Sequence, residues 1–225
     1  MSTTIGTLKE SSLHASVKQL YSRPGDLLEA KVDNSIIDIV RNDIFVEIQT
    51  GHFIGLKGKL EKHLGQTPIL VVYPISLDKQ ILRIAKDGHI ISSRKSPKHG
   101  KAEDLFSELV SIVKYVNHPN FSLEIVFIEE ETIWTDDGRG SWRRRGWSIL
   151  DRRLVKVMGR MLFKHPLDYK ALIPISLKGP FTSYDLAKEA GLRRSLASKM
   201  VYCLKMMGVI ELIGKMGRYN LYKKL

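Results

Sequence analysis

The chain has 225 residues, of which 43% are hydrophobic and 27% charged, so it is expected to fold into one large domain or two small ones. No stretch approaches the roughly 18 uncharged apolar residues of a membrane helix, and the N-terminal residues lack the apolar run of a signal peptide. The lone Cys203 excludes an intramolecular disulfide. These features predict a cytoplasmic protein without a membrane partner.

The formal net charge of +12 is unevenly distributed along the chain. Residues 1–133 contain 16 Lys and Arg against 17 Asp and Glu, whereas residues 134–225 contain 20 against 7. A strongly basic segment favours a polyanionic partner, because each phosphate that Lys or Arg neutralises releases counterions. We therefore expect a nucleic acid as the partner. The alternative is a basic soluble surface that binds nothing.

The predicted elements in the first two thirds of the chain alternate between helices and strands. Helices are expected where apolar residues recur at helical spacing, strands where apolar runs are bounded by turn residues, and a hairpin around Asp87-Gly88. In chain order these are a helix over 9–21, strands over 27–40 and 43–50 with turns at Asp33-Asn34 and Asn42-Asp43, a helix over 53–64, a strand over 68–75, a hairpin over 79–94, a helix over 102–116, a strand over 122–128 and a helix over 148–163. This order predicts a mixed α/β sheet with helices on its faces.

The C-terminal segment carries the most informative pattern. Thr182 or Ser183 is placed to cap a short helix that Gly191 ends, and a turn leads to a second helix over 194–207. A hairpin around Lys215-Met216 follows. This order resembles a winged helix, whose second helix enters a DNA groove. The resemblance implies DNA contacts at Arg193, Arg194, Ser198, Lys199, Tyr202, Lys215 and Arg218. The alternative is a winged helix that docks another protein.

The segment from Thr135 to Trp147 combines arginine with tryptophan. Guanidinium groups bind phosphate through paired hydrogen bonds, and indole rings stack on unpaired bases, so we expect this loop to contact a nucleic-acid strand. The residues expected to do so are Arg139, Trp142, Arg143, Arg144 and Arg145. Alternatively, Asp136 and Asp137 pair with the arginines, and the tryptophans anchor the loop to the core.

Two acidic residues, Asp38 and Glu47, occupy strand positions where an apolar residue is expected. A carboxylate is costly to bury there unless it is paired or binds a metal. Two carboxylates on adjacent strands, with a backbone carbonyl such as that of Ile48 and several waters, suit Mg²⁺ or Mn²⁺. Glu10, on the first helix, is placed to approach the same end of the sheet. Alternatively, Asp38 pairs with a nearby lysine, and Glu47 is an ordinary edge-strand charge.

This arrangement resembles the PD-(D/E)xK nuclease superfamily, whose core is a helix, a strand hairpin carrying Asp and then E-x-K, a helix and a further strand. Asp38 matches the first acid, and Glu47-Ile48-Gln49 matches E-x-K with Gln in place of Lys. Gln49 can orient a water molecule but supplies no cation. Some members of the superfamily carry the lysine on the following helix, where this chain has Lys57 and Lys59. Lys57 is preferred because it is nearer the helix start.

A second resemblance covers nearly the whole chain. The combination of VEIQTGHF…LKGKL, a later DDGRGSWRRRGWSI…DRR and the terminal winged helix is similar to an uncharacterised family of bacterial proteins with no established activity.

Together these features predict a restriction-endonuclease-like α/β domain over 1–133, a basic loop with a helical connector over 134–175 and a winged helix over 176–225. The expected function is metal-dependent hydrolysis of duplex or branched DNA in restriction, repair or defence. Asp38 and Glu47 would hold the metal, and Gln49 with Lys57 or Lys59 would act on the attacking water, assisted by Glu10. The alternative is a non-catalytic DNA-binding regulator on an inactive nuclease scaffold. Nucleases that cut both strands often pair, so a homodimer is compatible with this function.

Overall fold

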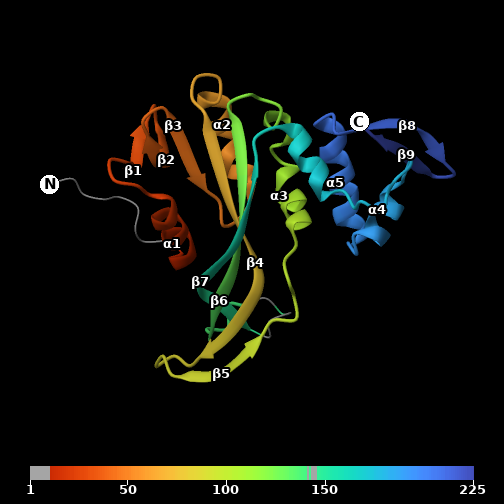
Figure 1. The fold of residues 1–225 in the computed structure, drawn as a ribbon. Helices are drawn as coiled ribbons and strands as arrows, with labels where there is room; N and C mark the ends of the chain where they lie inside the picture. Colours follow the sequence, from red (N-terminus) through yellow and green to blue (C-terminus); the bar gives the residue numbers. More distant parts are fainter. Residues whose placement is uncertain (1–10, 141, 143–145) are drawn as a thin grey trace.

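The computed structural model describes residues 11–140, 142 and 146–225, and it places a mixed sheet at the centre of the molecule (Figure 1). The sheet has seven strands in the order β1-β2-β3-β4-β6-β7, with β5 paired to β4 outside this path. The strands are β1 Leu27–Val32, β2 Ser35–Arg41, β3 Ile44–Ile48, β4 Ile69–Ile84, β5 Ile90–Lys95, β6 Phe121–Asp136 and β7 Trp147–Phe163. The predicted mixed α/β architecture is therefore confirmed.

Residues that favour turns determine where the first three strands end. Asp33 and Asn34 have φ of 45° and 67°, as a tight two-residue hairpin turn requires, and Asn42 has φ of 46° at the next turn. Gly88, with φ of 92°, lies in the predicted hairpin between β4 and β5. These turns were predicted correctly because the residues that tolerate left-handed backbone also specify the turn.

Strands β3, β4 and β6 run parallel to one another and are covered on both faces. Helix α1, Ser12–Tyr21, packs Leu13 and Val17 on one face. The opposite face is covered by η1 Phe53–Leu56, α2 Lys57–His63, η2 Ala102–Leu105, α3 Phe106–Leu109 and η3 Val113–Tyr115. Residues 102–116, predicted as one helix, form the three short helical segments η2, α3 and η3.

The segment predicted as a helix over residues 148–163 is strand β7, and that prediction is wrong. Apolar residues of this segment also recur at helical spacing, but β7 pairs with β6 along its length, from Leu123 opposite Phe163 to Asp136 opposite Trp147. Gly159 disfavours a helix by about 1 kcal/mol relative to alanine. The 134–175 segment is consequently part of the central sheet, where we had expected a helical connector.

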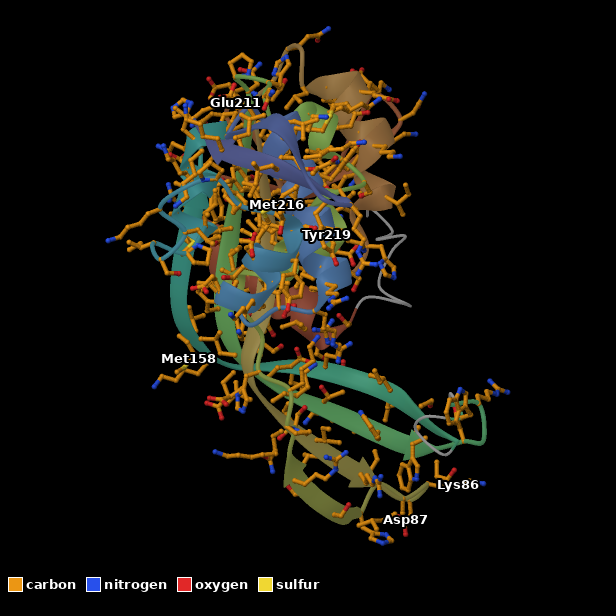
Figure 2. All side chains as sticks on the ribbon, turned by 90° about the vertical axis from the view of Figure 1, so that its right-hand side faces the viewer. Lys86, Asp87, Met158, Glu211, Met216 and Tyr219 are labelled. Carbon is orange, nitrogen blue, oxygen red and sulfur yellow. The ribbon has the colours of Figure 1, made fainter. Side chains whose placement is uncertain are left out.

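Strands β4, β6 and β7 continue beyond the body of the molecule as a twisted arm, and β5 joins them (Figure 1). The strand predicted over 68–75 and the first strand of the hairpin predicted over 79–94 form one strand, β4, with a register irregularity between Ser76 and Asp78. Figure 2 shows Lys86 and Asp87 at the far end of this arm, well away from the C-terminal hairpin that carries Glu211 and Tyr219.

The C-terminal unit contains η5 Pro166–Leu172, α4 Ser183–Glu189, α5 Arg194–Met206, β8 Ile210–Met216 and β9 Tyr219–Lys224. Thr182 caps α4 through a reciprocal pair with Asp185, as its position predicts. The β8–β9 turn lies at Gly217-Arg218, two residues beyond the predicted position, because Gly217 supplies the required φ of 59°. One hydrophobic cluster extends from the sheet into this unit. No helix in the described ranges is long and apolar enough to span a membrane.

Candidate metal site and basic surfaces

The β2–β3 pair places Asp38 and Glu47 opposite each other. Ile39 pairs with Val46 in the antiparallel register, so the next two residues, Asp38 and Glu47, face each other where the pair ends. Their side chains are 15% and 1% exposed, respectively. The structure thus brings together the two acids that the sequence singled out.

Lys59 of α2 holds the Glu47 carboxylate. Its Nζ donates to both Glu47 oxygens at 2.7 Å. Burial is the main reason that the pKa of Glu47 is raised to about 7; the positive charge of Lys59 opposes this rise, and the nearby charge of Asp38 adds to it. The structure therefore brings Lys59, and not the preferred Lys57, to the Glu47 carboxylate. Lys59 reaches the carboxylate, whereas Lys57 makes no side-chain hydrogen bond in the described part of the chain.

Asp38 is held from two directions. Its Oδ2 accepts the backbone N–H of Ile48 at 2.7 Å and lies 3.4 Å from Nε2 of His14 on α1. Burial raises the pKa of Asp38, but the hydrogen bonds from His14 and Ile48 outweigh it and lower the pKa below its ordinary value. His14 Nε2 is also 3.1 Å from the Ile48 carbonyl oxygen. His14 could not be identified from the sequence, because it lies 34 residues before Ile48, the residue that it contacts.

The oxygens at this strand end suit a hard cation. The Asp38 carboxylate and the Ile48 carbonyl both approach His14 Nε2 within 3.4 Å, and Glu47 is opposite Asp38. Carboxylate and carbonyl oxygens are the donors that Mg²⁺ prefers. Within the described residues, no three His, Cys, Asp or Glu side chains form a metal-binding cluster. Glu10 lies outside the described residues. The backbone N–H of Gln49, next to the site, donates to the Val72 carbonyl at 2.8 Å.

A second buried cluster, centred on Glu130 of β6, was missed. Glu130 is fully buried and accepts two hydrogen bonds of 2.8 Å from the Arg152 guanidinium. Lys79 lies 3.1 Å away, and the hydroxyls of Ser76 and Thr132 also donate to Glu130. Burial alone would raise the pKa of Glu130, but these partners lower it to about 2. The available signal was the Glu129–Glu131 run, whose strand alternation points the middle acid inward.

Arg152 links this cluster to the candidate metal site. Its Nη1 donates to the Thr50 carbonyl at 2.9 Å, two residues beyond Ile48. A hollow of about 290 Å³ beside Arg152 is lined by Lys79, Lys98 and Asp104, among others. The base of the arm therefore presents cations close to the end of β3.

The Arg/Trp loop is described only in part, and Arg143, Arg144 and Arg145 lie outside the described residues. Trp142 is 83% exposed, and Arg139 is also exposed. Asp137 accepts the Arg139 backbone N–H at 2.9 Å and thereby shapes the loop. Trp147 instead packs against Arg83, whose guanidinium carbon lies 5.0 Å from its ring centroid. Of the two tryptophans of the loop, Trp142 is the exposed one.

The α5 residues for which the winged-helix resemblance implies DNA contacts are divided between two surfaces. Arg193 and Lys199 line a cleft against the body, and Lys199 Nζ donates to the Ser107 carbonyl at 3.2 Å. Ser198 and Tyr202 line a hollow of about 430 Å³ on the hairpin side. The division arises because η2, α3 and η3 cover one side of α5.

Two stacked tyrosines lie between two arginines on the outside of the C-terminal unit. The guanidinium carbon of Arg194 lies 5.1 Å from the centroid of the Tyr184 ring, and that of Arg218 lies 5.1 Å from the centroid of the Tyr219 ring. The two tyrosine rings are stacked, with their centroids 6.2 Å apart. Lys215 lies within β8, opposite Asn220. Cation–π contacts of this kind hold guanidinium groups at the surface.

Comparison with known proteins identifies the family. Residues 11–164 match a family described as a domain of unknown function, DUF8091. The chain is 32% identical over 223 residues to an uncharacterized protein of Treponema pallidum (strain Nichols). The matched segment covers 98% of this chain and 88% of that protein. No solved structure gives a significant match. The matched range contains the whole central sheet and both carboxylate clusters, and the chain belongs to the DUF8091 family.

Proposed function

We propose that the protein is a divalent-metal-dependent DNA endonuclease of the PD-(D/E)xK type. The observation that carries the proposal is the contact between Lys59 and Glu47. The E-x-K motif lacks its lysine at Gln49, and Lys59 reaches the same carboxylate from the following helix. The site thus combines two facing carboxylates with a lysine.

The residues of this chain divide the work in the proposed site. Asp38, Glu47 and the Ile48 carbonyl would hold the cation, which when bound polarises the scissile phosphate and lowers the pKa of the attacking water. Lys59 holds the Glu47 carboxylate in place and contributes a positive charge beside the phosphate. The hydrogen bond from Ile48 N–H and the contact with His14 fix the Asp38 carboxylate.

Binding of DNA is assigned to the basic surfaces, and the C-terminal unit is proposed to be a winged helix. A helix, a turn, a second helix and a hairpin follow in the order of that fold. The Arg194–Tyr184–Tyr219–Arg218 row and the hollow beside Tyr202 would contact the duplex. The exposed Trp142 and Arg139 lie beyond Asp136, at the end of the arm far from the Asp38–Glu47 site, and would contact DNA at a distance from the scissile phosphate.

Plasmid and branched-DNA cleavage in Mn²⁺ or Mg²⁺ tests the proposal. Asp38→Asn, Glu47→Gln and Lys59→Met are expected to abolish or strongly reduce cleavage. Asp43→Asn, in the exposed turn of the same hairpin, and Lys62→Met, exposed on the same helix as Lys59, are matched controls that should cleave like the wild type. Cleavage that persists in Asp38→Asn and Glu47→Gln at the wild-type rate would refute the assignment.

A second candidate is a non-catalytic DNA-binding regulator. It is favoured by the fact that each carboxylate already has protein partners, Glu47 in Lys59 and Asp38 in the Ile48 N–H. A regulator would bind DNA equally well in chelator and in Mg²⁺ and would cleave no substrate. A nuclease would require the metal for cleavage and lose the activity in EDTA.

A further inference from the structure

A basic cleft separates the base of the arm from helix α5. It has a volume of about 600 Å³ and is lined on one side by the segment 97–107 and on the other by residues 191–199. The cations that line it are Lys98, Lys101, Arg193 and Lys199, with His99 beside them and Asp104 as the acidic residue. Two parts of the chain about ninety residues apart therefore bring their positive charges together, as the 90-residue separation of Lys101 and Gly191 illustrates.

Two of these cations fix the cleft, and two are available to a ligand. Lys101 Nζ donates to the carbonyls of Ala190 and Gly191 at 3.0 and 3.3 Å, and Lys199 bonds to Ser107. In the described part of the chain, the side chains of Lys98 and Arg193 make no hydrogen bond or ion pair, and both residues are exposed.

Asp104 is the acidic residue of the cleft, against four cations. The Asp104 carboxylate accepts the backbone N–H of Lys101 at 3.2 Å, in the cap of η2. The cleft therefore keeps an excess of positive charge, which suits phosphate groups.

The cleft adjoins a second cavity, the hollow beside Arg152. Lys98 and Asp104 line both the cleft and the hollow beside Arg152, so the two cavities adjoin. Arg152 in turn bonds to Thr50 beyond the end of β3. Arg193, Lys98 and Arg152 therefore line the two adjoining cavities, and Arg152 also contacts the segment that follows β3.

We propose that this cleft binds the sugar-phosphate backbone of the DNA and leads it to the Asp38–Glu47 site. The inference rests on the proposed function and adds a defined path for the substrate. Lys98 and Arg193 contact phosphates, and Lys101 and Lys199 hold the two walls at the required separation. In this arrangement α5 binds DNA along its body-facing side as well as on its hairpin side.

Fluorescence anisotropy with a labelled duplex, measured over a series of salt concentrations, tests the path. The double variant Lys98→Gln/Arg193→Gln is compared with Lys62→Gln/Lys178→Gln, which removes the same charge from exposed positions outside the cleft. Each lost phosphate contact reduces the slope of log affinity against log salt by about 1. We expect the cleft variant to lower the slope by about 2, to the same extent for unrelated DNA sequences, and the control to leave it unchanged.

The outcomes separate this inference from the proposed function. If the wild type binds and cleaves DNA but the cleft and control variants have the same salt slope, the path alone is overturned. A wild type that binds no DNA at low salt would overturn both. Polyglutamate that binds through Lys98 and Arg193, while DNA affinity is unaffected by their substitution, would identify an acidic polypeptide as the occupant and also overturn the path.

Discussion

Replacement of Arg152 by methionine should destabilise the fold strongly, because it leaves the Glu130 carboxylate buried without its main partner. Glu130 is 0% exposed and accepts two hydrogen bonds of 2.8 Å from the guanidinium. A folded-state pKa of about 2, against 4.5 for an ordinary glutamate, corresponds to about 3 kcal/mol. Breaking a buried ion pair costs about 3–5 kcal/mol. Because Lys79 and two hydroxyls remain, we expect a loss of about 3 kcal/mol for Arg152→Met.

Urea denaturation followed by circular dichroism measures this loss as a change in midpoint at a constant slope. Arg153→Met is the matched control, since Arg153 is 57% exposed and its nearest carboxylates are 3.6 Å away. Exposed pairs of this kind contribute at most about 1 kcal/mol. The double variant Glu130→Gln/Arg152→Met should recover part of the loss. An Arg152→Met protein within about 0.5 kcal/mol of the Arg153→Met protein would refute the reasoning.

Three further predictions concern the same fold. The stability supplied by Glu130 is fully present above the unfolded-state pKa of 4.5 and is lost as the pH falls toward 2, so acid unfolding followed by fluorescence should be less steep in Glu130→Gln, and identical acid profiles would contradict this. Gly100→Ala places a methyl group 2.5 Å from the Ser76 carbonyl oxygen and should cost about 1–3 kcal/mol in a thermal melt, whereas Gly65→Ala, whose methyl group meets nothing within 4 Å, should cost much less. Burial raises the pKa of Cys203 to about 12, so a thiol reagent at pH 8 should label Cys203 only after denaturant is added, and rapid labelling of the native protein would contradict its burial.

Features determined by neighbouring residues could be predicted from the sequence. The turns at Asp33-Asn34 and Gly88 depend on residues that favour left-handed backbone, and they fix the register that brings Asp38 opposite Glu47. Helices α4 and α5 likewise follow from the Thr182 cap and the spacing of apolar residues.

Features that depend on distant partners could not be predicted. Strand β7 has apolar residues at spacings compatible with a helix or a strand, and its pairing with β6 decides between them. The Glu130–Arg152 pair joins residues on two strands whose adjacency the sequence does not reveal. The division of the α5 surface depends on Lys199 reaching Ser107, 92 residues earlier in the chain. His14 and Lys59 reach the acids from two different helices.

The most direct test of the account is a titration of the protein with Mn²⁺ in the presence of an uncleavable DNA duplex, with the binding heat measured by isothermal calorimetry. The central claim is that Asp38 and Glu47 form a divalent-cation site. We predict a binding event in the wild type and in Asp43→Asn that disappears in Asp38→Asn, although all three proteins melt alike. Equal Mn²⁺ binding by Asp38→Asn, or none by the folded wild type on DNA, would contradict the claim.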